Sequence, residues 1–406
     1  MQLDFMAKSS WRSHFSKHTV RILKSISLMV FGLGLTILLS AYPGIAIPPQ
    51  LSPEIRGVWM TTNDSDIVRD HAKLQEAVNQ LARLNFNTIY PVVWNSGYVF
   101  YPSGIAQAKG FQPFIRRGLQ GQDVLADLIT QSHQKGLLVI PWFEFGFMAP
   151  PSSELALNHP QWLTSRQDGS LTWEGVAGEV VWLNPFHPQV QQLIIDLVVE
   201  VMTLYPVDGI QFDDHLSLPI EFGYDPYTIK LYQQEMKASP PSNPKDEAWV
   251  RWRANKITEF VEKLRKAVKA KNPKAIFSIA PNPYHTAYNS HLQDWVGWVK
   301  KNLVDELIVQ IYRPDLPSFV REMTKAEIKE AQRKIPTGVG ILTGLRNRPI
   351  GMNQIQAKVQ AARQNGLGFS FFFYESLWDE APEPIQERQS KFQTLFYYPA
   401  SRAFLR

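Results

Sequence analysis

The chain has 406 residues, of which 44% are hydrophobic, 12% aromatic and 19% charged. This composition supports a large buried core, in one α/β domain or two smaller ones, and excludes a disordered or nucleic-acid-coating protein. The net charge is +5, and the absence of cysteine excludes disulfide bonds, thiolate nucleophiles and cysteine metal ligands.

The first 46 residues have the features of an export segment. Five Lys/Arg residues precede an apolar run from Ile26 to Ala41, and Gly44 and Ala46 place small residues at the −3 and −1 positions of a cleavage site. A basic N-terminal part, an apolar middle part and a cleavage site with small residues predict a signal peptide. An uncleaved anchor, with residues 22–41 as a membrane tether, is the alternative. Both interpretations place the protein outside the cytoplasm, as a periplasmic, secreted or membrane-anchored domain.

The same segment holds most of the net positive charge. Residues 1–46 carry five Lys/Arg and one acid, a net charge of +4 out of +5, so the rest of the chain is close to neutral at +1. The basic composition is therefore no evidence for nucleic-acid binding. A Pro-rich linker, "IPPQLSP" at residues 47–53, precedes the predicted domain, residues 54–400.

From Glu54 onward, strand-like and helix-like stretches alternate along the chain. Amphipathic stretches predict helices, for example over residues 70–85, 123–136 and 353–366, and several begin with Asp or Asn, which are helix-capping residues. Eight hydrophobic runs predict strands over residues 54–62, 86–94, 137–146, 207–215, 275–283, 304–313, 336–344 and 367–377.

This alternation predicts βαβ units around a parallel sheet, and eight units predict an α/β fold of the (β/α)8 TIM-barrel type in a single domain. An open doubly wound sheet is the alternative, but no GxGxxG or P-loop motif follows a predicted strand. Long connections after the third and fourth strands, residues 147–188 and 216–255, predict loops that shape a cleft. Residues 392–406 predict a strap that packs against the barrel.

Polar and aromatic residues gather at the C-terminal ends of the predicted strands, where the active sites of TIM barrels lie. The strand starts are less polar. We therefore expect these side chains to converge on one opening and to bind substrate there. The predicted substrate-binding residues are Trp59, Asn63, Asp64, Trp94, Asn95, Trp142, His215, Asn282, Gln310, Tyr312, Arg313, Tyr374 and Trp378.

The fourth predicted strand, "VDGIQFDDH", ends in two acids and a histidine. Side chains alternate faces along a strand, so Ile210 and Phe212 suit the helix layer outside the barrel. Gln211 and Asp213 then point into the barrel, and Asp213 is the inward acid at its top.

The next two residues extend this group. The Asp214 side chain is expected to point toward the rim of the barrel, and the His215 side chain to point inward again, above Asp213. On the third strand, Trp142 and Glu144 share a face. Alternation alone does not decide whether that face points into the barrel, because the earlier residues of this strand are apolar on both faces.

Acids that converge on one opening suit glycosidic bond cleavage. This reaction needs two carboxyl groups around the bond, one protonated as the acid and one ionised as nucleophile or base. Different surroundings provide the two different pKa values. Aromatic rings stack on sugar faces, and amide and guanidinium groups bind hydroxyls, so the predicted partner is a polysaccharide or other glycan.

The motifs "RGVWMTT", "GIQFDDH", "VQIYRPDLPSF", "GVGILTGLR" and "FFFYESLWD" resemble the bacterial glycosyl-hydrolase-like family 10 over about residues 54–380. The resemblance implies a TIM-barrel glycoside hydrolase that acts on cell-wall (peptidoglycan) glycan or another extracellular polysaccharide. The family's strand-four acid pair corresponds to Asp213 and Asp214, and its strand-eight motif to Tyr374 and Glu375. Many relatives have Tyr in place of His215, and Asn-Pro where this chain has Glu144 and Phe145.

The predicted catalytic residues are therefore four acids. Asp213 is the predicted nucleophile or base, and Asp214 either takes part or orients its loop. The predicted proton donor is Glu144 or Glu375, since Glu375 emerges from an apolar strand that would raise the pKa of its carboxyl group. An acid pair at a strand end can also serve only as a helix cap.

Neither a metal nor a cofactor is expected, because the chain shows no HExxH motif and no tight cluster of His and Asp. The alternative function is a carbohydrate-binding or cell-envelope scaffold protein on a catalytically inactive barrel. Such a protein would retain glycan without releasing products.

Overall fold

The computed structural model describes residues 53–61, 67, 70–111, 123–175, 178–345, 348–379 and 381–402. The predicted export segment and tether lie outside these residues, as do Asn63 and Asp64. Among the described helices, none combines the length and the apolar character that a membrane crossing needs.

In the described part of the chain, eight parallel strand segments form the central sheet. The third is interrupted after two residues and carries two labels, β5 and β6. The strands are β1 (Arg56–Met60), β2 (Thr88–Pro91), β5 (Leu138–Val139) with β6 (Trp142–Phe143), β10 (Gly209–Asp213), β11 (Ile276–Ala280), β12 (Glu306–Gln310), β13 (Thr337–Leu342) and β16 (Gly368–Phe372).

The pairing of these strands closes the sheet. The order is β5-β2-β1-β16-β13-β12-β11-β10-β6, so it begins and ends on the same interrupted strand. β5 pairs with β2, β6 pairs with β10, and a further parallel bridge joins Val92 to Trp142. The predicted (β/α)8 barrel is therefore confirmed, and each predicted strand contains an observed one.

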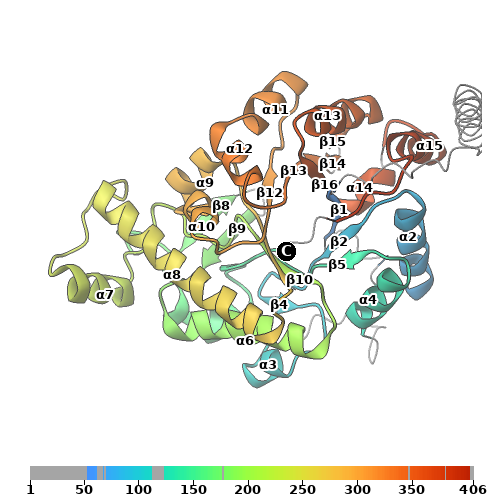
Figure 1. The fold of residues 1–406 in the computed structure, drawn as a ribbon. Helices are drawn as coiled ribbons and strands as arrows, with labels where there is room; N and C mark the ends of the chain where they lie inside the picture. Colours follow the sequence, from blue (N-terminus) through green and yellow to red (C-terminus); the bar gives the residue numbers. More distant parts are fainter. Residues whose placement is uncertain are drawn as a thin grey trace, which may run out of the picture. The chain divides into compact units, whose positions relative to one another are not determined.

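Helices lie around the outside of the strands (Figure 1). As predicted, Asp70 caps the first of them by accepting hydrogen bonds from the backbone N–H groups of Ala72 and Lys73. The described helices are α2 (His71–Arg83), α3 (Gly104–Ala108), α4 (Val124–Gln134), α5 (Glu154–Asn158), α6 (Pro188–Leu204), α7 (Pro226–Met236), α8 (Glu247–Lys271), α9 (Tyr284–His291), α10 (Trp295–Lys300), α11 (Leu316–Met323), α12 (Ala326–Gln332), α13 (Met352–Gln364), α14 (Tyr374–Trp378) and α15 (Ile385–Leu395).

Two separate clusters of buried apolar side chains fill the molecule. The larger lies between strands and helices and contains Ile210 and Phe212, the outward residues of β10. The smaller fills the inside of the barrel, and its buried members are Ile55, Trp59, Tyr90, Val92, Ile140, Trp142, Ala280 and Ile308. The separation shows that the two faces of the strands serve different layers, as expected for a closed barrel.

The long connection after the third strand is more ordered than the sequence suggests. It contains a three-stranded antiparallel sheet in the order β7 (Met148–Ala149), β9 (Gly178–Trp182) and β8 (Thr172–Gly175). The connection after the fourth strand contains α7 and the first part of α8, which Figure 1 shows extending to one side. Two short hairpins, β3 (Trp94–Asn95) with β4 (Tyr98–Val99) and β14 (Gly344–Leu345) with β15 (Arg348–Pro349), follow other strands.

The C-terminal segment packs across the end of the barrel where the strands begin. The Glu54 N–H donates to the carbonyl of Ser401 at 3.0 Å. Arg402 enters the barrel and forms an ion pair with Glu306, which is buried at the start of β12 and also accepts the Tyr90 hydroxyl at 2.8 Å. The predicted strap is therefore present as far as the described residues reach.

Candidate active site

β10 carries the acid that sits deepest in the barrel opening. Its alternation is as predicted: Phe212 stacks on Phe143 in the outer layer, with ring centroids 5.0 Å apart. On the inner face, Gln211 accepts from the Trp59 Nε1–H at 2.6 Å inside the barrel. Asp213 has the same orientation and ends the strand, with only 2% of its surface exposed.

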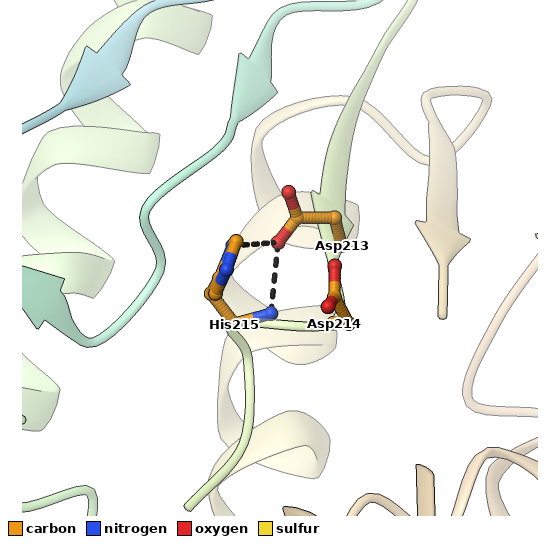
Figure 2. A group of neighbouring side chains, drawn as sticks. All are labelled: Asp213, Asp214 and His215. Carbon is orange, nitrogen blue, oxygen red and sulfur yellow. Dashed lines mark hydrogen bonds and ion pairs between the residues drawn. The ribbon is translucent and has the colours of Figure 1, made fainter. Parts of the chain in front are cut away.

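Both carboxyl oxygens of Asp213 are hydrogen-bonded. Trp142 Nε1–H donates to Oδ2 at 3.1 Å. Oδ1 accepts the His215 backbone N–H at 2.9 Å and lies 3.0 Å from His215 Nδ1, as Figure 2 shows. Trp142 therefore uses its indole N–H to hold the acid, which shows that the inner face of the third strand is the one that carries Trp142.

Asp214 is more exposed and has different partners. Asn282 Nδ2–H donates to Asp214 Oδ2 at 2.8 Å, and Gln310 Nε2–H donates to Oδ1 at 2.9 Å. These amides come from β12 and from the end of β11, so two neighbouring strands hold the carboxylate. Both residues were predicted as substrate-binding residues, and the structure brings them to this acid.

Glu144 follows β6 and reaches the same group of acids. Asn95 Nδ2–H donates to its Oε2 at 2.6 Å, and its backbone carbonyl lies 2.7 Å from His215 Nδ1. The loop can approach this closely because Gly146 has φ +46 and no side chain. An added Cβ there would lie 2.5 Å from the carbonyl oxygen of His215.

The three acids differ in their electrostatic surroundings. Burial raises the pKa of Glu144 to about 7; the Asn95 hydrogen bond opposes this shift, while the charge of Asp213 adds to it. Burial also raises the pKa of Asp213 to about 6, although the His215 charge opposes that shift. Asp214, by contrast, is partly exposed and accepts hydrogen bonds from two neutral amides.

The charges of these carboxylates shift the pKa values of two further groups. Burial lowers the pKa of His215, but the charges of Asp213 and Asp214 outweigh it and raise the value to about 10, so the imidazole is protonated at neutral pH. Tyr312 lies close enough for burial and the charges of these acids to raise its pKa well above 10. Its ring packs on Phe372 with centroids 5.5 Å apart.

Asp213, Asp214 and His215 lie together at the end of β10, as predicted, but they also form the tight cluster of His and Asp that was not expected from the sequence. One ligand atom from each lies within 4.8 Å of the others, which is close enough to surround a metal ion. His215 Nδ1 donates to the carbonyl of Glu144, so Nε2 is the ring nitrogen that would hold a metal ion. In the structure, His215 and Asp213 form an ion pair at 3.0 Å.

Some predicted aromatic residues lie in the outer layer. Trp94 is fully buried there and donates to the carbonyl of Gly146 at 3.0 Å. The Tyr374 hydroxyl donates to Gln80 on α2 at 2.7 Å, and Trp378 packs on Phe392. The structure places all three rings in the outer layer and not at the acids. Tyr374 and Trp378 face the helix layer because the residues after β16 turn into helix α14.

Other predicted residues occupy different positions. Arg313 lies 3.9 Å from Glu322, an ion pair on the side of α11. Glu375 lies in the first turn of α14, half-buried, on the same side of the barrel as the acids. Trp59 is buried inside the barrel, with its ring centroid 6.3 Å from that of Trp142.

The sequence analysis missed two supporting residues. Gln293 is fully buried, and its Nε2–H donates to the backbone carbonyl of Asp213 at 2.8 Å. Phe372 packs against both Trp59 and Trp142, with centroids 6.1 and 6.3 Å away. The alternation of β16 could have identified Phe372 as inward-facing, whereas Gln293 lies in an irregular segment with no such signal.

The sequence is similar to known glycosyl hydrolases over most of its length. The model of a family described as "Glycosyl hydrolase-like 10" matches residues 54–362. "Glycosyl hydrolase DigH" of Escherichia coli K12 is 25% identical over 314 residues, 68% of this chain and 69% of that protein. "Glycosyl hydrolase YngK" of Bacillus subtilis is 19% identical over 325 residues, 73% of this chain and 60% of that protein.

Solved structures share the fold at low sequence identity. The PgaB (BpsB) glycoside hydrolase domain of Bordetella bronchiseptica has a TM-score of 0.64 and 15% identity, covering 86% of this chain and 100% of that one. The catalytic domain of β-amylase from Paenibacillus polymyxa has a TM-score of 0.58 and 9% identity, covering 84% of this chain and 98% of that one. These similarities support the barrel fold.

Proposed function

We propose that this chain, which belongs to the glycosyl hydrolase-like 10 family, cleaves O-glycosidic bonds in an extracytoplasmic polysaccharide. The observation that carries the proposal is the group of acids at the barrel opening. Glu144, Asp213 and Asp214 come from two neighbouring strands, and burial raises the pKa of Glu144 to about 7 but that of Asp213 only to about 6. Hydrolysis of a glycoside needs a division between a protonated and an ionised carboxyl group.

Glu144 is the proposed general acid. A carboxyl group with a pKa of about 7 is partly protonated at neutral pH and can deliver a proton to the leaving oxygen of the glycoside. The amide of Asn95 holds one of its oxygens and orients the group. Glu375 is the alternative donor, since it lies at the same end of the barrel.

Asp213 is the proposed nucleophile or base. It is ionised at neutral pH, and Trp142 and His215 fix its position through hydrogen bonds to both oxygens. Depending on the separation between this acid and the donor, it would attack the anomeric carbon directly or activate a water molecule. The neighbouring Asp214, held by two amides, would stabilise the positive charge that develops on the sugar ring.

The resemblance to family members supports cell-wall glycan, or another extracellular polysaccharide, as the substrate class. The test is incubation of the protein with peptidoglycan glycan strands and with common polysaccharides, followed by mass spectrometry of the products. Shortened glycans are expected from the wild type and not from Asp213→Asn. Retention of glycan by both proteins, with no product from either, would instead indicate a carbohydrate-binding scaffold.

A further inference from the structure

Exposed basic residues gather at the end of the barrel opposite the acids. In a parallel barrel, every helix-to-strand connection lies at this end. The exposed lysines and arginines at or just after the ends of the preceding helices are Arg83, Lys135, Lys271, Lys274, Lys300, Lys301, Arg333 and Lys334. We refer to these eight residues as the basic face.

The acids at the same end do not balance this charge at the surface. Asp305 is buried and pairs with Lys269 at 2.7 Å, and Glu306 is buried against Arg402. Glu54 pairs with Arg363 at 2.7 Å. The remaining acid in the described connections, Asp208, is partly buried and accepts the Val139 N–H at 2.7 Å.

The ion pairs that described residues of the basic face form with acids are weak. Lys300 lies 3.9 Å from Glu330, and Lys301 lies 3.2 Å from Glu262. Both pairs are largely exposed, so solvent screens them. The face therefore keeps a net positive potential toward solvent.

Helix dipoles account for only part of this pattern. They favour basic residues in the last turn of a helix, as at Lys271 and Lys300. Lys274 lies three residues beyond the end of α8, and Lys334 lies two residues beyond the end of α12. The effect of the dipole falls off within one turn, so it is weak at these two positions.

Large apolar side chains are exposed at the same end. Tyr397 and Tyr398 are 73% and 58% exposed, with ring centroids 4.8 Å apart. Arg56 Nη1–H donates to the carbonyl of Tyr398 at 2.7 Å, which fixes the pair beside the start of β1. Leu204, at the end of α6, is 54% exposed. Tyrosine beside lysine and arginine is the composition that suits a membrane–water interface.

The barrel sequence begins at this end. Residues 54–56 lie against the C-terminal strap, and the predicted apolar run ends at Ala41, twelve residues before Pro53. Twelve extended residues span at most about 40 Å. In the alternative in which residues 22–41 remain as an anchor, a tether of this length would keep the basic face within reach of the membrane.

We propose that the basic face, with Tyr397 and Tyr398, binds the anionic headgroups of a phospholipid membrane. Lysines and arginines near an anionic bilayer surface add to its affinity, and the tyrosine rings enter the headgroup region. This function is separate from hydrolysis. It directs the opening that carries Asp213 away from the bilayer and toward polymers outside it.

The absence of cysteine allows a direct test in the full-length chain. Single cysteines at Gln364→Cys, at the end of α13, and at Ser242→Cys, in the connection after β10, would carry a fluorophore on opposite ends of the barrel. The protein is inserted into phosphatidylcholine vesicles, with or without phosphatidylglycerol, that contain a headgroup quencher. We expect several-fold stronger quenching at position 364 than at 242, only with the anionic lipid, and its loss at high salt.

Charge reversal identifies the residues responsible. Lys271→Glu with Lys274→Glu should abolish the anionic-lipid-dependent quenching at position 364. The matched control, Lys230→Glu with Lys245→Glu, makes the same charge change on exposed lysines after β10 and should leave it unchanged.

Thermal denaturation confirms that both variants are folded. Equal quenching at positions 364 and 242 would overturn the proposal, as would quenching that is independent of lipid charge. A soluble polyanion that binds the face while anionic vesicles produce no quenching would also overturn it.

Discussion

The side chain of Glu144 determines the alkaline side of the expected pH dependence. If it donates the proton and Asp213 must be ionised, kcat/KM rises as pH passes about 6 and falls as it passes about 7. Glu144→Gln should lower kcat about 100- to 10,000-fold and remove the alkaline limb. A pH–rate profile on the substrate found by product analysis measures both effects. An unchanged alkaline limb in this variant would assign the donor to another acid.

The same raised pKa affects stability. A carboxyl group whose pKa is higher in the folded protein than in the unfolded chain binds more protons when folded, so stability falls as pH rises from about 4 to about 7. Glu144→Gln removes this loss, and the variant should gain stability relative to wild type at pH 8 but not at pH 4. Urea denaturation at the two pH values gives the comparison.

His215 controls the acidic side of the profile. Its positive charge lowers the pKa of Asp213 against the effect of burial. His215→Phe removes that charge, so the acidic limb of kcat/KM should move to higher pH. The control is His285→Phe, an exposed histidine on α9, which should leave the limb in place. If the acidic limb of the kcat/KM profile stays near pH 6 in the His215 variant, the ionisation of Asp213 does not determine that limb.

At the scale of elements, the turn after β6 positions Glu144 against the turn after β10. Gly146→Ala would place a Cβ 2.5 Å from the His215 carbonyl in a backbone conformation that disfavours a side chain. We expect a loss of about 2–4 kcal/mol in the free energy of unfolding. Gly136→Ala is the matched control, since Gly136 also has positive φ (+75) but nothing lies within 4 Å of the added Cβ. An equal loss in both variants would rule out the contact as the cause.

The strands were predictable from sequence because each is a short apolar run between capped helices. The inward and outward faces of β10 could also be predicted, since its apolar and polar residues alternate. The inward face of the third strand could not be predicted, because Trp142 and Phe143 are both apolar. The hydrogen bond from Trp142 to Asp213 shows that Trp142 faces inward. The antiparallel sheet at residues 148–182 was missed, because its strands are short and β7 pairs with β9 across a long interval of sequence.

The candidate site was predictable where it follows from the order of strands. Asp213 and Asp214 are adjacent in sequence, and the amides of Asn282 and Gln310 end the next two strands. The outward turn after β16 was not predictable, because the run that contains Tyr374 is apolar on both faces.

At the scale of the whole molecule, the C-terminal strap closes the barrel at the end opposite the acids. Arg402→Met leaves the Glu306 carboxylate buried without its cation, which should cost about 3–5 kcal/mol of unfolding free energy. The double variant Arg402→Met with Glu306→Gln should recover much of this loss. Denaturant titration of the three proteins gives the comparison. Equal stabilities of the single variant and the wild type would show that the strap does not stabilise the barrel.

The rate of product release from glycan by Asp213→Asn, compared with wild type, is the most direct measurement of the central claim. The substitution keeps the shape of the side chain and removes its charge. We expect a loss of at least about 1,000-fold in kcat, with a melting temperature close to that of wild type. A folded variant that releases products at the wild-type rate would contradict it.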